Sequence, residues 1–534
     1  MRDVLWRGKC KCAVYLATLA ATLNLASMAR AEFVMTLLYT SDIHSHFDAV
    51  APDGSLCREE PVADVECTGG IARLATAVRE LRQANANTLL VDAGDMGRGT
   101  DYDTYFRGTL GAELMSAIGY DAMVPGNHEF DWGVEGFLRF SQRTNFPFVA
   151  ANVRTEDVPE LANKMFRSVT LAVGGEQVGV VGVTVPEMYE RSEPGALLGF
   201  TAAASAVQFE VDALTAQGVN KIIVLSHLGY YPDRRLAQEL SDVDLIVGGH
   251  SHVLLSNSDP KALAPSPDYV NGIGILQAGA FAEHLGILKV TFDSEGQIVA
   301  TSGDPLKITS DIVEDPEIAT RLELAREEIE MRRMASVATV SGLVDGSRTT
   351  CRIRECTAGN LITDAMLFHQ RYRGAGIALY YAGAINASID QGDVTFEEVR
   401  DVLRYGYAIS RFQASGAQVI EALEHSVAAY PEPSREFLQV SGIRFGFDPK
   451  APVGQRVRNV SVSEDGHFVP LLPEKVYMVI TSTTMREGRL GYDMFAEAAY
   501  AYDHSLFIWD LVALYLAENS PYAPSEDGRI RILD

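Results

Sequence analysis

Five short apolar stretches of this chain are each followed within a few residues by side chains that bind metal ions. Carboxylate, amide and imidazole groups follow the stretches, and consecutive parallel strands would bring them to one edge of a sheet. This pattern constrains the fold to an α/β sheet with helices packed on it and a site at the carboxyl ends of the strands. The stretches are 33–39, 88–91, 121–124, 221–225 and 243–247, and the residues that follow include Asp42, His44, Asp95, Asn127, His128, His227, His250 and His252.

The domain organisation follows from the length of the chain and from a change in the sequence pattern after residue 304. A chain of 534 residues with 47% apolar residues is too long for one hydrophobic core, so two or three domains are expected. Segments with helical spacing, such as 71–81 and 206–217, alternate with the apolar stretches, whereas 315–335 is highly charged, favours a helix and carries no site motif. We predict a first domain over 32–314, a linker helix over 315–335 and a second domain of mixed helices and strands over 336–534.

The first 31 residues are typical of a secretory signal. Basic residues precede an apolar run over 12–26, and Ala29-Arg30-Ala31 supplies a small-x-small cleavage site. A membrane anchor is the less favoured alternative, because the run is shorter than the ~20 residues that a span needs. No later segment is long and apolar enough to span a bilayer. We expect cleavage near Ala31 and a periplasmic or secreted protein without a membrane span.

The cysteines support an oxidising compartment. Two of the six leave with the signal, and the four that remain form two close sequential pairs, Cys57 with Cys67 and Cys351 with Cys356. Disulfides within these pairs would close two small local loops. Metal binding by the thiols is the weaker alternative, because no cysteine lies near the histidine motifs.

The charge excludes one class of partner. The net charge is −26, and removal of residues 1–31 takes away five basic residues and one acidic residue, which leaves −30. Such a field repels nucleic acid polymers and anionic membrane surfaces. A small-molecule phosphate ester can still bind at a local cationic site.

The strand-end residues supply the ligands of a two-metal site. Asp95 is the candidate bridge; Asp42, His44 and His252 would complete one ion's shell, and Asn127, His227 and His250 the other's. Imidazole with carboxylate suits two divalent ions, of which zinc and manganese are the leading candidates. Two ions ~3.5 to 4 Å apart can deprotonate a water between them, and the hydroxide can attack phosphorus in line with the leaving oxygen. A single histidine near a strand end is usually a polar loop residue, but here five histidines would have to coincide in these motifs.

A histidine–carboxylate dyad lies beside the predicted ligands. His128 directly follows Asn127, so its imidazole is expected to face the substrate, and Asp131 three residues later can orient it and keep it protonated. The dyad would stabilise the phosphoryl charge and assist the leaving group. Glu129 is expected to anchor the loop, and Asp92 to be structural.

These motifs resemble the 5'-nucleotidase family of calcineurin-like metallophosphoesterases, which includes bacterial periplasmic UDP-sugar hydrolases and animal ecto-5'-nucleotidases. The resemblance implies a two-sheet sandwich flanked by helices, a linker helix, and a mixed α/β domain that carries the substrate pocket and rotates about the linker. It also implies that the paired cysteines form disulfides. The motifs that carry it are Ser41-Asp42-Ile43-His44-Ser45, 69–74, Asp92-Ala93-Gly94-Asp95, Gly126-Asn127-His128-Glu129-Phe130-Asp131, 248–252, 351–356 and Gly359-Asn360-Leu361.

For the second domain, the resemblance implies that Arg352 binds phosphate, Asp493 binds the ribose hydroxyls and Tyr405 stacks on the base. Two pocket positions depart from the family. Tyr381 stands where the family typically has an asparagine, and Asn386 where it has an arginine. Asparagine cannot imitate the bidentate, permanently charged clamp of a guanidinium. Arg354 and Arg404 are candidates to compensate, although neutral surface positions are favoured for both.

Together these features predict an exported dinuclear-metal phosphohydrolase, with nucleoside 5'-monophosphates as the leading substrates. The remodelled pocket leaves a nucleotide sugar, a 2',3'-cyclic nucleotide, a non-nucleotide phosphate or a sulfur ester as alternatives. A catalytically inactive surface binding protein is less favoured, because such a protein would be expected to lose metal ligands first and none is missing.

Overall fold

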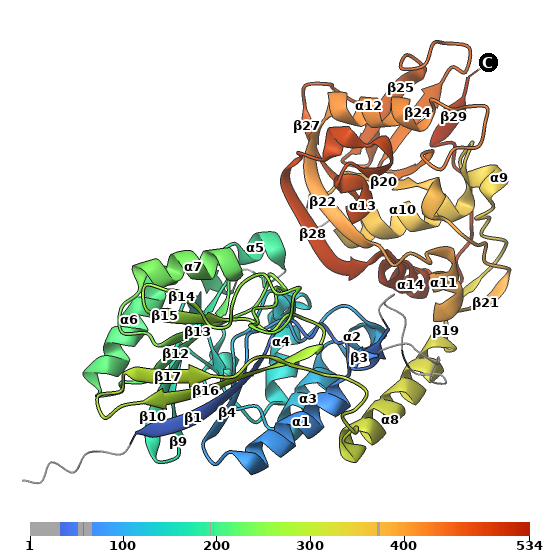
Figure 1. Ribbon diagram of the computed structural model, residues 1–534. Helices are drawn as coiled ribbons and strands as arrows, with labels where there is room; N and C mark the ends of the chain where they lie inside the picture. Colours follow the sequence, from blue (N-terminus) through green and yellow to red (C-terminus); the bar gives the residue numbers. More distant parts are fainter. Residues whose placement is uncertain are drawn as a thin grey trace, which may run out of the picture.

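Two α/β domains joined by one long helix make up the protein (Figure 1). The computed structural model describes residues 32–51, 57, 67–192, 194–195, 197–370 and 374–533. The predicted signal, residues 1–31, lies outside the described residues. The connecting helix, α8 (Pro316–Arg333), falls within the predicted linker and begins at a clear cap, because the Asp315 side chain accepts hydrogen bonds from the amides of Glu317 and Ile318.

The described part of the first domain contains two large sheets besides two short two-stranded ones, and both large sheets are largely parallel in the region that leads to the site. In the first sheet β1, β4, β5, β6 and β8 run parallel, and β16 lies antiparallel beside β1. In the second sheet β10, β12, β13 and β15 run parallel. The order of the first is β17 (Ile298–Ser302), β16 (His284–Phe292), β1 (Phe33–Thr40), β4 (Thr88–Asp92), β5 (Ala122–Met123), β6 (Phe148–Val149), β8 (Met165–Phe166), with β18 (Leu306–Lys307) also on β16; the order of the second is β14 (Asp268–Val270), β15 (Ile273–Leu276), β13 (Leu245–Gly248), β12 (Ile222–His227), β10 (Glu176–Thr184), β9 (Ser168–Val173).

Alternating side chains of β1 show why the sheets stack as a sandwich. Leu37 and Tyr39 lie in a core formed between the two sheets, whereas Leu38 lies in a core formed with the helices of the outer face. Full burial of one such side chain stabilises the fold by roughly 1.5–3 kcal/mol, so a one-residue slip of β1 is strongly disfavoured. The register that delivers the residues after β1 to the sheet edge is therefore fixed. Helices α1 (Ile71–Ala84), α3 (Thr109–Ile118) and α4 (Gly133–Gln142) cover the outer face of the first sheet, and α6 (Ala203–Ala216) and α7 (Tyr230–Glu239) that of the second.

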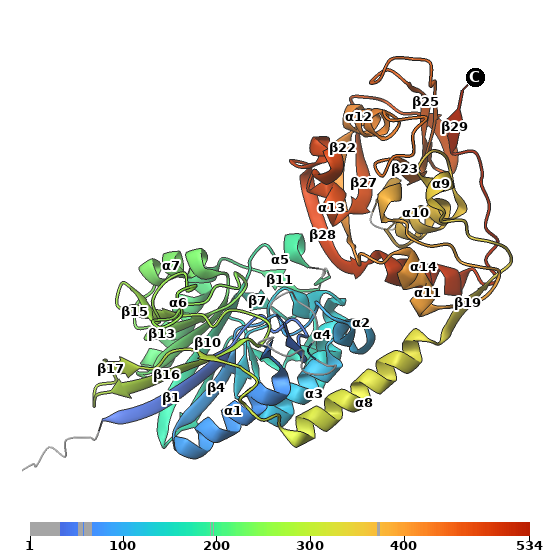
Figure 2. The same ribbon diagram turned by 45° about the vertical axis from the view of Figure 1, so that its right-hand side comes forward.

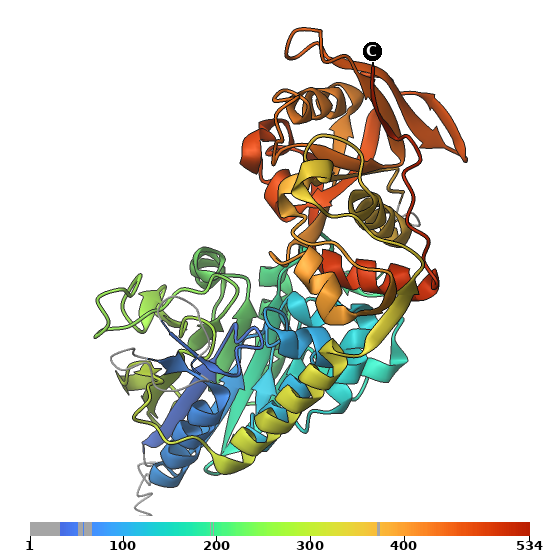
Figure 3. The same cartoon turned by 90° about the vertical axis from the view of Figure 1, so that its right-hand side faces the viewer.

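The second domain is also mixed α/β, as the resemblance implied, and has one continuous core (Figure 3). Helices α10 (Thr357–Gln370), α12 (Gly416–Ser426) and α14 (Ile508–Glu518) pack on its sheets. One sheet has the order β23 (Leu438–Ser441), β20 (Ile377–Tyr381), β27 (Val476–Ser482), β22 (Ala408–Ser415), β28 (Ala499–Phe507), and the other β26 (His467–Pro470), β25 (Val457–Glu464), β24 (Ile443–Phe447), β29 (Ile530–Ile532).

Both predicted disulfides are present, Cys57–Cys67 and Cys351–Cys356, and this excludes the alternative in which these thiols bind metal. The second bridge lies where α9 (Arg348–Cys351) leads into α10. No helix within the described ranges has the length and apolar character needed to cross a bilayer.

Residues 438–447 form two strands, β23 and β24, with a break between them. The break falls at Gly442, whose φ of 73° is the left-handed region that favours glycine. A Cβ at this position would lie 2.0 Å from the carbonyl oxygen of Gly376. A contact with a loop more than sixty residues away therefore ends β23 and lets β24 join the other sheet.

Figure 2 shows α8 running from the first domain to the second. Polar contacts connect the domains around the end of this helix. The guanidinium of Arg333 donates two hydrogen bonds, both of 2.7 Å, to the carboxylate of Glu397 in α11 (Phe396–Val402). Arg400 in α11 donates a 2.8 Å hydrogen bond to Asp101 in α2 (Asp101–Phe106) of the first domain. These contacts place α11 against both the linker and the first domain.

Candidate metal centre

Strand ends of both sheets meet at one edge of the first domain and deliver the predicted ligands there. Asp42 lies two residues after β1, and Asp95 three residues after β4. His227 is the last residue of β12, and His250 follows the end of β13 by two residues. Because β1 pairs in parallel with β4 and β12 in parallel with β13, these chain ends point the same way. The fold itself therefore gathers the side chains.

The backbone at the ligand positions is unusual. Non-glycine residues rarely adopt positive φ, and each such residue costs of order 1–3 kcal/mol. Such strain persists only where the surroundings hold it, and it is concentrated here at the metal-binding motifs. The φ values are 53° at Asp42, 49° at His44, 60° at Asp95, 71° at His250 and 55° at His252.

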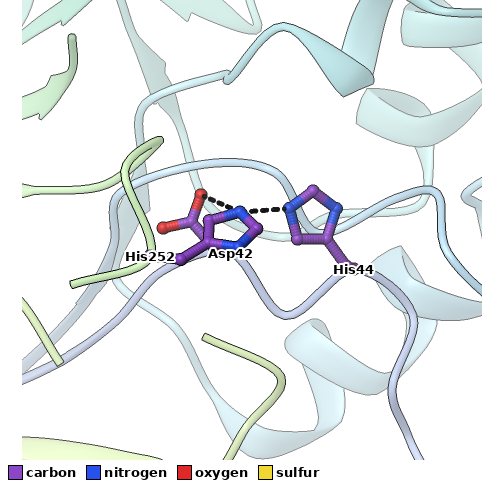
Figure 4. Close-up of side chains that lie close together, drawn as sticks. All are labelled: Asp42, His44 and His252. Carbon is purple, nitrogen blue, oxygen red and sulfur yellow. Dashed lines mark hydrogen bonds and ion pairs between the residues drawn. The ribbon is translucent and has the colours of Figure 1, made fainter. Parts of the chain in front are cut away.

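Asp42, His44 and His252 form one candidate ligand group (Figure 4). The Nε2 atoms of His44 and His252 lie 3.0 Å apart, and Nε2 of His252 lies 3.6 Å from Oδ1 of Asp42. Two imidazole nitrogens and a carboxylate oxygen that converge in this way can share one ion.

Asp95, His227 and His250 form a second candidate group, and Asp95 also belongs with His44 and His128. Oδ2 of Asp95 lies 3.1 Å from Nε2 of His227 and 3.8 Å from Nε2 of His44. One carboxylate thus lies between histidines of both groups, which is the position of a bridging ligand.

Hydrogen bonds on the far side of two imidazoles fix which nitrogen faces the centre. Nδ1 of His227 lies 2.6 Å from the carbonyl oxygen of Ala93, and Nδ1 of His44 lies 3.2 Å from that of Gly97. A carbonyl only accepts, so each Nδ1 carries a proton and each Nε2 faces the site.

Burial lowers the pKa of His227, but the carboxylates of Asp95 and Asp42 outweigh this effect and raise it to about 10, so an ion would have to displace its second proton. The charge state of the other groups fits metal binding directly. Burial lowers the pKa of His44 to about 3 and that of His250 to about 4, so both imidazoles are neutral, as ligation requires. Burial raises the pKa of Asp42 to about 7, and the neighbouring carboxylate of Asp95 adds to this rise. Oδ1 of Asn127 is buried and has no hydrogen-bond partner within the described part of the chain. Divalent ions need donors of this kind: a buried carboxylate whose negative charge lacks a balancing positive charge, neutral imidazoles, and an amide oxygen without a hydrogen-bond partner.

His128 and Asp131 form the predicted pair. Nδ1 of His128 lies 2.6 Å from Oδ2 of Asp131, whose side chain is 1% exposed. Burial lowers the pKa of His128, but the carboxylates of Asp131 and Asp95 outweigh this effect, and the net pKa is raised. The hydroxyl of Ser192 donates a 2.9 Å hydrogen bond to Oδ1 of Asp131, a partner that no sequence pattern indicates.

Glu129 anchors the ligand loops, as predicted. Its carboxylate accepts hydrogen bonds from the amides of Asp95 (3.0 Å), Met96 (2.9 Å) and Gly126 (2.6 Å). Asp92 has the expected structural role, because it accepts from the Thr40 hydroxyl at 2.6 Å. These two acids hold the loops that carry Asp95 and Asn127.

Sequence reasoning missed Arg98, whose Nη1 lies 3.4 Å from Nε2 of His128. The available signal was weak: a basic residue between two glycines, three positions after the ligand Asp95. Its neighbour in space, His128, is thirty residues away in the chain.

In the second domain, Tyr405 and Arg352 lie near each other. Tyr405 is 49% exposed, and its ring stacks on Tyr407 with centroids 5.6 Å apart. Nε of Arg352 is buried and has no hydrogen-bond partner within the described residues. Partial burial lowers the pKa of Arg352, and the positive charges of Arg348 and Arg435 lower it further. An exposed aromatic ring therefore lies beside a group of arginines.

The other predicted pocket residues are placed differently. Tyr381 is 2% exposed and packs against Tyr380 and Tyr407. The Asn386 amide donates to the carbonyl oxygen of Ala384 at 2.9 Å, so it is engaged within its own loop. Asp493, at the start of η6 (Asp493–Phe495), is exposed.

The remaining candidate cations differ in their surroundings. Arg354 forms a 3.2 Å ion pair with Glu526 at the surface, in agreement with the neutral position favoured for it. Arg404 is exposed. Neither residue supplies a buried clamp.

A sandwich whose strand ends surround one shared aspartate with imidazoles is the architecture of a metallophosphoesterase. Residues 35–254 match the family described as calcineurin-like phosphoesterase, and residues 335–497 match the family described as 5'-nucleotidase, C-terminal domain.

Relatives match this chain over nearly its whole length, across both domains. The chain is 34% identical to a 5'-nucleotidase of Diplobatis ommata over 94% of this chain and 91% of that protein, and 35% identical to a 5'-nucleotidase of Bos taurus over 93% and 90%. A 5'-nucleotidase precursor structure from Thermus thermophilus is 35% identical, with a TM-score of 0.58 and coverage of 94% of this chain and 100% of that chain. The chain belongs to the 5'-nucleotidase family, and with it to the metal-dependent phosphoester hydrolases.

Proposed function

We propose that this protein is an exported, dinuclear-metal 5'-nucleotidase that releases phosphate from nucleoside 5'-monophosphates. The observation that carries the proposal is the position of the Asp95 carboxylate, 3.1 Å from one candidate ligand histidine and 3.8 Å from another in a different group. A bridging carboxylate of this kind is the centre of a two-metal hydrolytic site.

Seven side chains would hold the metals. Two divalent ions, when bound, would supply an ionised water as nucleophile at neutral pH and positive charge against the phosphoryl group. Zinc and manganese are the proposed ions, because both accept imidazole together with carboxylate. The proposed assignment is Asp42, His44 and His252 to one ion, Asn127, His227 and His250 to the other, and Asp95 to both.

His128 and Asp131 act on the substrate in this proposal. The Asp131 carboxylate accepts a hydrogen bond from Nδ1–H of His128. The Nε2–H of His128 can then donate to a phosphoryl oxygen. The imidazolium stabilises charge as it moves onto the phosphoryl and leaving oxygens. Burial of Asp131 keeps this hydrogen bond away from competing water.

The nucleotide assignment rests on the second domain. The exposed ring of Tyr405 offers a stacking surface for a base, and the unpartnered Nε of Arg352 offers a donor for an anionic group. Asp493 is exposed and is proposed to accept hydrogen bonds from ribose hydroxyls. The relatives named above as 5'-nucleotidases support the same substrate class.

Phosphate release by purified protein tests the proposal. With added manganese or zinc, we expect rapid release from AMP, slower release from a generic aryl phosphate, and loss of both activities in His128→Ala. Cleavage of the aryl phosphate without cleavage of AMP would keep the metal site but refute the nucleotide assignment. No hydrolysis of any ester by metal-loaded protein would refute the enzymatic function.

We also propose export with cleavage near Ala31, and domain boundaries at 32–314, 315–335 and 336–534. Amino-terminal sequencing of protein from the exporting host should begin at Glu32. A start at Met1 in exported protein would refute the cleaved signal.

A further inference from the structure

Arg98 lies in a tightly packed loop between the candidate ligand Asp95 and helix α2. A Cβ on Gly99 would lie 2.6 Å from the carbonyl oxygen of His44, so the loop touches the segment that carries this candidate ligand. The next residue, Thr100, donates a 2.8 Å hydrogen bond to the carbonyl oxygen of Ser45 and caps α2. The backbone of Arg98 is therefore held in place from its carboxyl side.

The guanidinium of Arg98 lies over the imidazole of the dyad. Nη1 is 3.5 Å from Nδ1 and 3.4 Å from Nε2 of His128, and that Nε2 is itself 3.9 Å from Oδ2 of Asp95. Within the described ranges Arg98 forms no ion pair with a carboxylate, in a chain with a net charge of −26. Among the described residues, a partly buried cation thus lies beside His128 of the dyad without a carboxylate partner of its own.

The backbone of Arg98 has a φ of 66°, in the left-handed region where a glycine would be unstrained. Both neighbours in sequence are glycines, so the chain carries an arginine where a third glycine would fit with less strain. Such outliers are typical of functional sites, where the surrounding structure holds a side chain in a required position.

We propose that Arg98 is a catalytic residue that binds the phosphoryl oxygens of the substrate together with His128; the inference rests on the proposed function of the same site. Only Nη1 of the Arg98 guanidinium faces His128, and no carboxylate within the described residues pairs with the guanidinium, so it has donors to offer an anion beside His128. A phosphoryl group brings that anion, and the planar guanidinium donates to two of its oxygens at once.

The alternative for Arg98 is packing alone, as a cation over an aromatic ring. Arg107 provides a matched control for this alternative. It also has a left-handed backbone, with a φ of 48°, and its guanidinium lies 4.6 Å from the ring centroid of Trp132. If the Arg98 contact is packing alone, both arginines should respond alike to substitution.

The test compares Arg98→Gln, Arg98→Lys and Arg107→Gln with the metal-loaded wild type. Arg98→Gln is expected to lower kcat/KM for AMP about 10- to 100-fold and to weaken inhibition by inorganic phosphate by a similar factor, since a charge-assisted hydrogen bond is lost. Arg98→Lys should recover part of both effects, and Arg107→Gln should stay within about twofold of wild type. The rise in Tm caused by inorganic phosphate should shrink in Arg98→Gln, while metal content stays at the wild-type level.

Wild-type kcat/KM and phosphate inhibition in Arg98→Gln would overturn the inference, and so would a loss of bound metal that accounts for the lost activity. These outcomes differ from failure of the proposed function. If the wild type cleaves only the aryl phosphate, the nucleotide assignment fails, and the same comparison of variants on the aryl phosphate still decides the role of Arg98.

Discussion

Asp131→Asn is the substitution that isolates the contribution of the dyad. The change keeps the shape of the side chain and removes its negative charge. In the wild type, that charge lies on a carboxylate whose Oδ2 is 2.6 Å from Nδ1 of His128. Burial alone lowers the pKa of His128, and the Asp131 carboxylate is the largest of the effects that raise it. Without this carboxylate the pKa of His128 falls, and less of the imidazole is protonated near neutral pH.

The size of the effect follows from the hydrogen bond that is lost. A hydrogen bond to a charged group contributes about 1.5–3 kcal/mol, and one pKa unit corresponds to about 1.4 kcal/mol. Loss of this hydrogen bond should therefore lower the pKa of His128, and kcat near pH 8 should fall about 10- to 100-fold.

The assay is kcat for AMP across pH 5 to 10 with saturating metal. In the wild type, activity should decline at high pH as His128 loses its proton; in Asp131→Asn this decline should begin at lower pH. Ser192→Ala removes only the 2.9 Å hydrogen bond to the other carboxylate oxygen and should cause a smaller shift in the same direction. A uniform loss at every pH, with no displacement of the decline, would refute the account of Asp131 as the group that keeps His128 protonated.

Three further outcomes are expected. Arg352→Ala should raise KM for AMP by about 10-fold or more through loss of a charged donor, whereas Arg354→Ala, which breaks a surface ion pair, should leave KM unchanged; equal effects in steady-state kinetics would contradict the assignment. Glu129→Ala leaves three buried amides without their acceptor and should lower the free energy of unfolding by several kcal/mol (about 1–3 kcal/mol each) in denaturant titrations, while Glu129→Gln should cost less. Burial raises the pKa of Asp510 to about 7, so its stabilising contribution is fully present below its unfolded pKa of about 3.9 and is lost as pH rises through 7; the Tm of Asp510→Asn relative to wild type should rise over this interval, and a pH-independent difference would exclude the shift.

The gathering of the candidate metal ligands at one sheet edge was predictable because each of these residues is local to a strong signal. A buried parallel strand is a continuous apolar stretch in the sequence, and the polar residue at its end needs no knowledge of distant contacts. The disulfides were predictable for the same reason, since each joins cysteines close in sequence. Ser192 and Arg98 were missed because they meet Asp131 and His128 only through the folded chain.

The predicted pocket residues differ in their exposure to solvent, and the sequence pattern does not show this difference. Tyr381 and Tyr405 are the same residue type in the same domain, yet one is 2% and the other 49% exposed. The strand β20 is paired on both sides, by β23 and β27, and its last residue is buried with the rest of the strand. Tyr405 instead follows α11 in a loop, where its ring reaches the surface.

Two of the polar contacts between the domains are of a kind that a bound substrate can outweigh. Arg400 with Asp101 and Arg333 with Glu397 are partly exposed pairs, and such pairs contribute about 0–1 kcal/mol each. A ligand shifts a conformational equilibrium by the difference in its affinity for the two states, so about 2 kcal/mol of differential binding is enough to compete with both pairs. A nucleotide held at its base by Tyr405 and at its phosphate by Arg98 and His128 would contact both domains at once. In the proposed function, its binding energy would then act on the position of the second domain against the candidate metal centre.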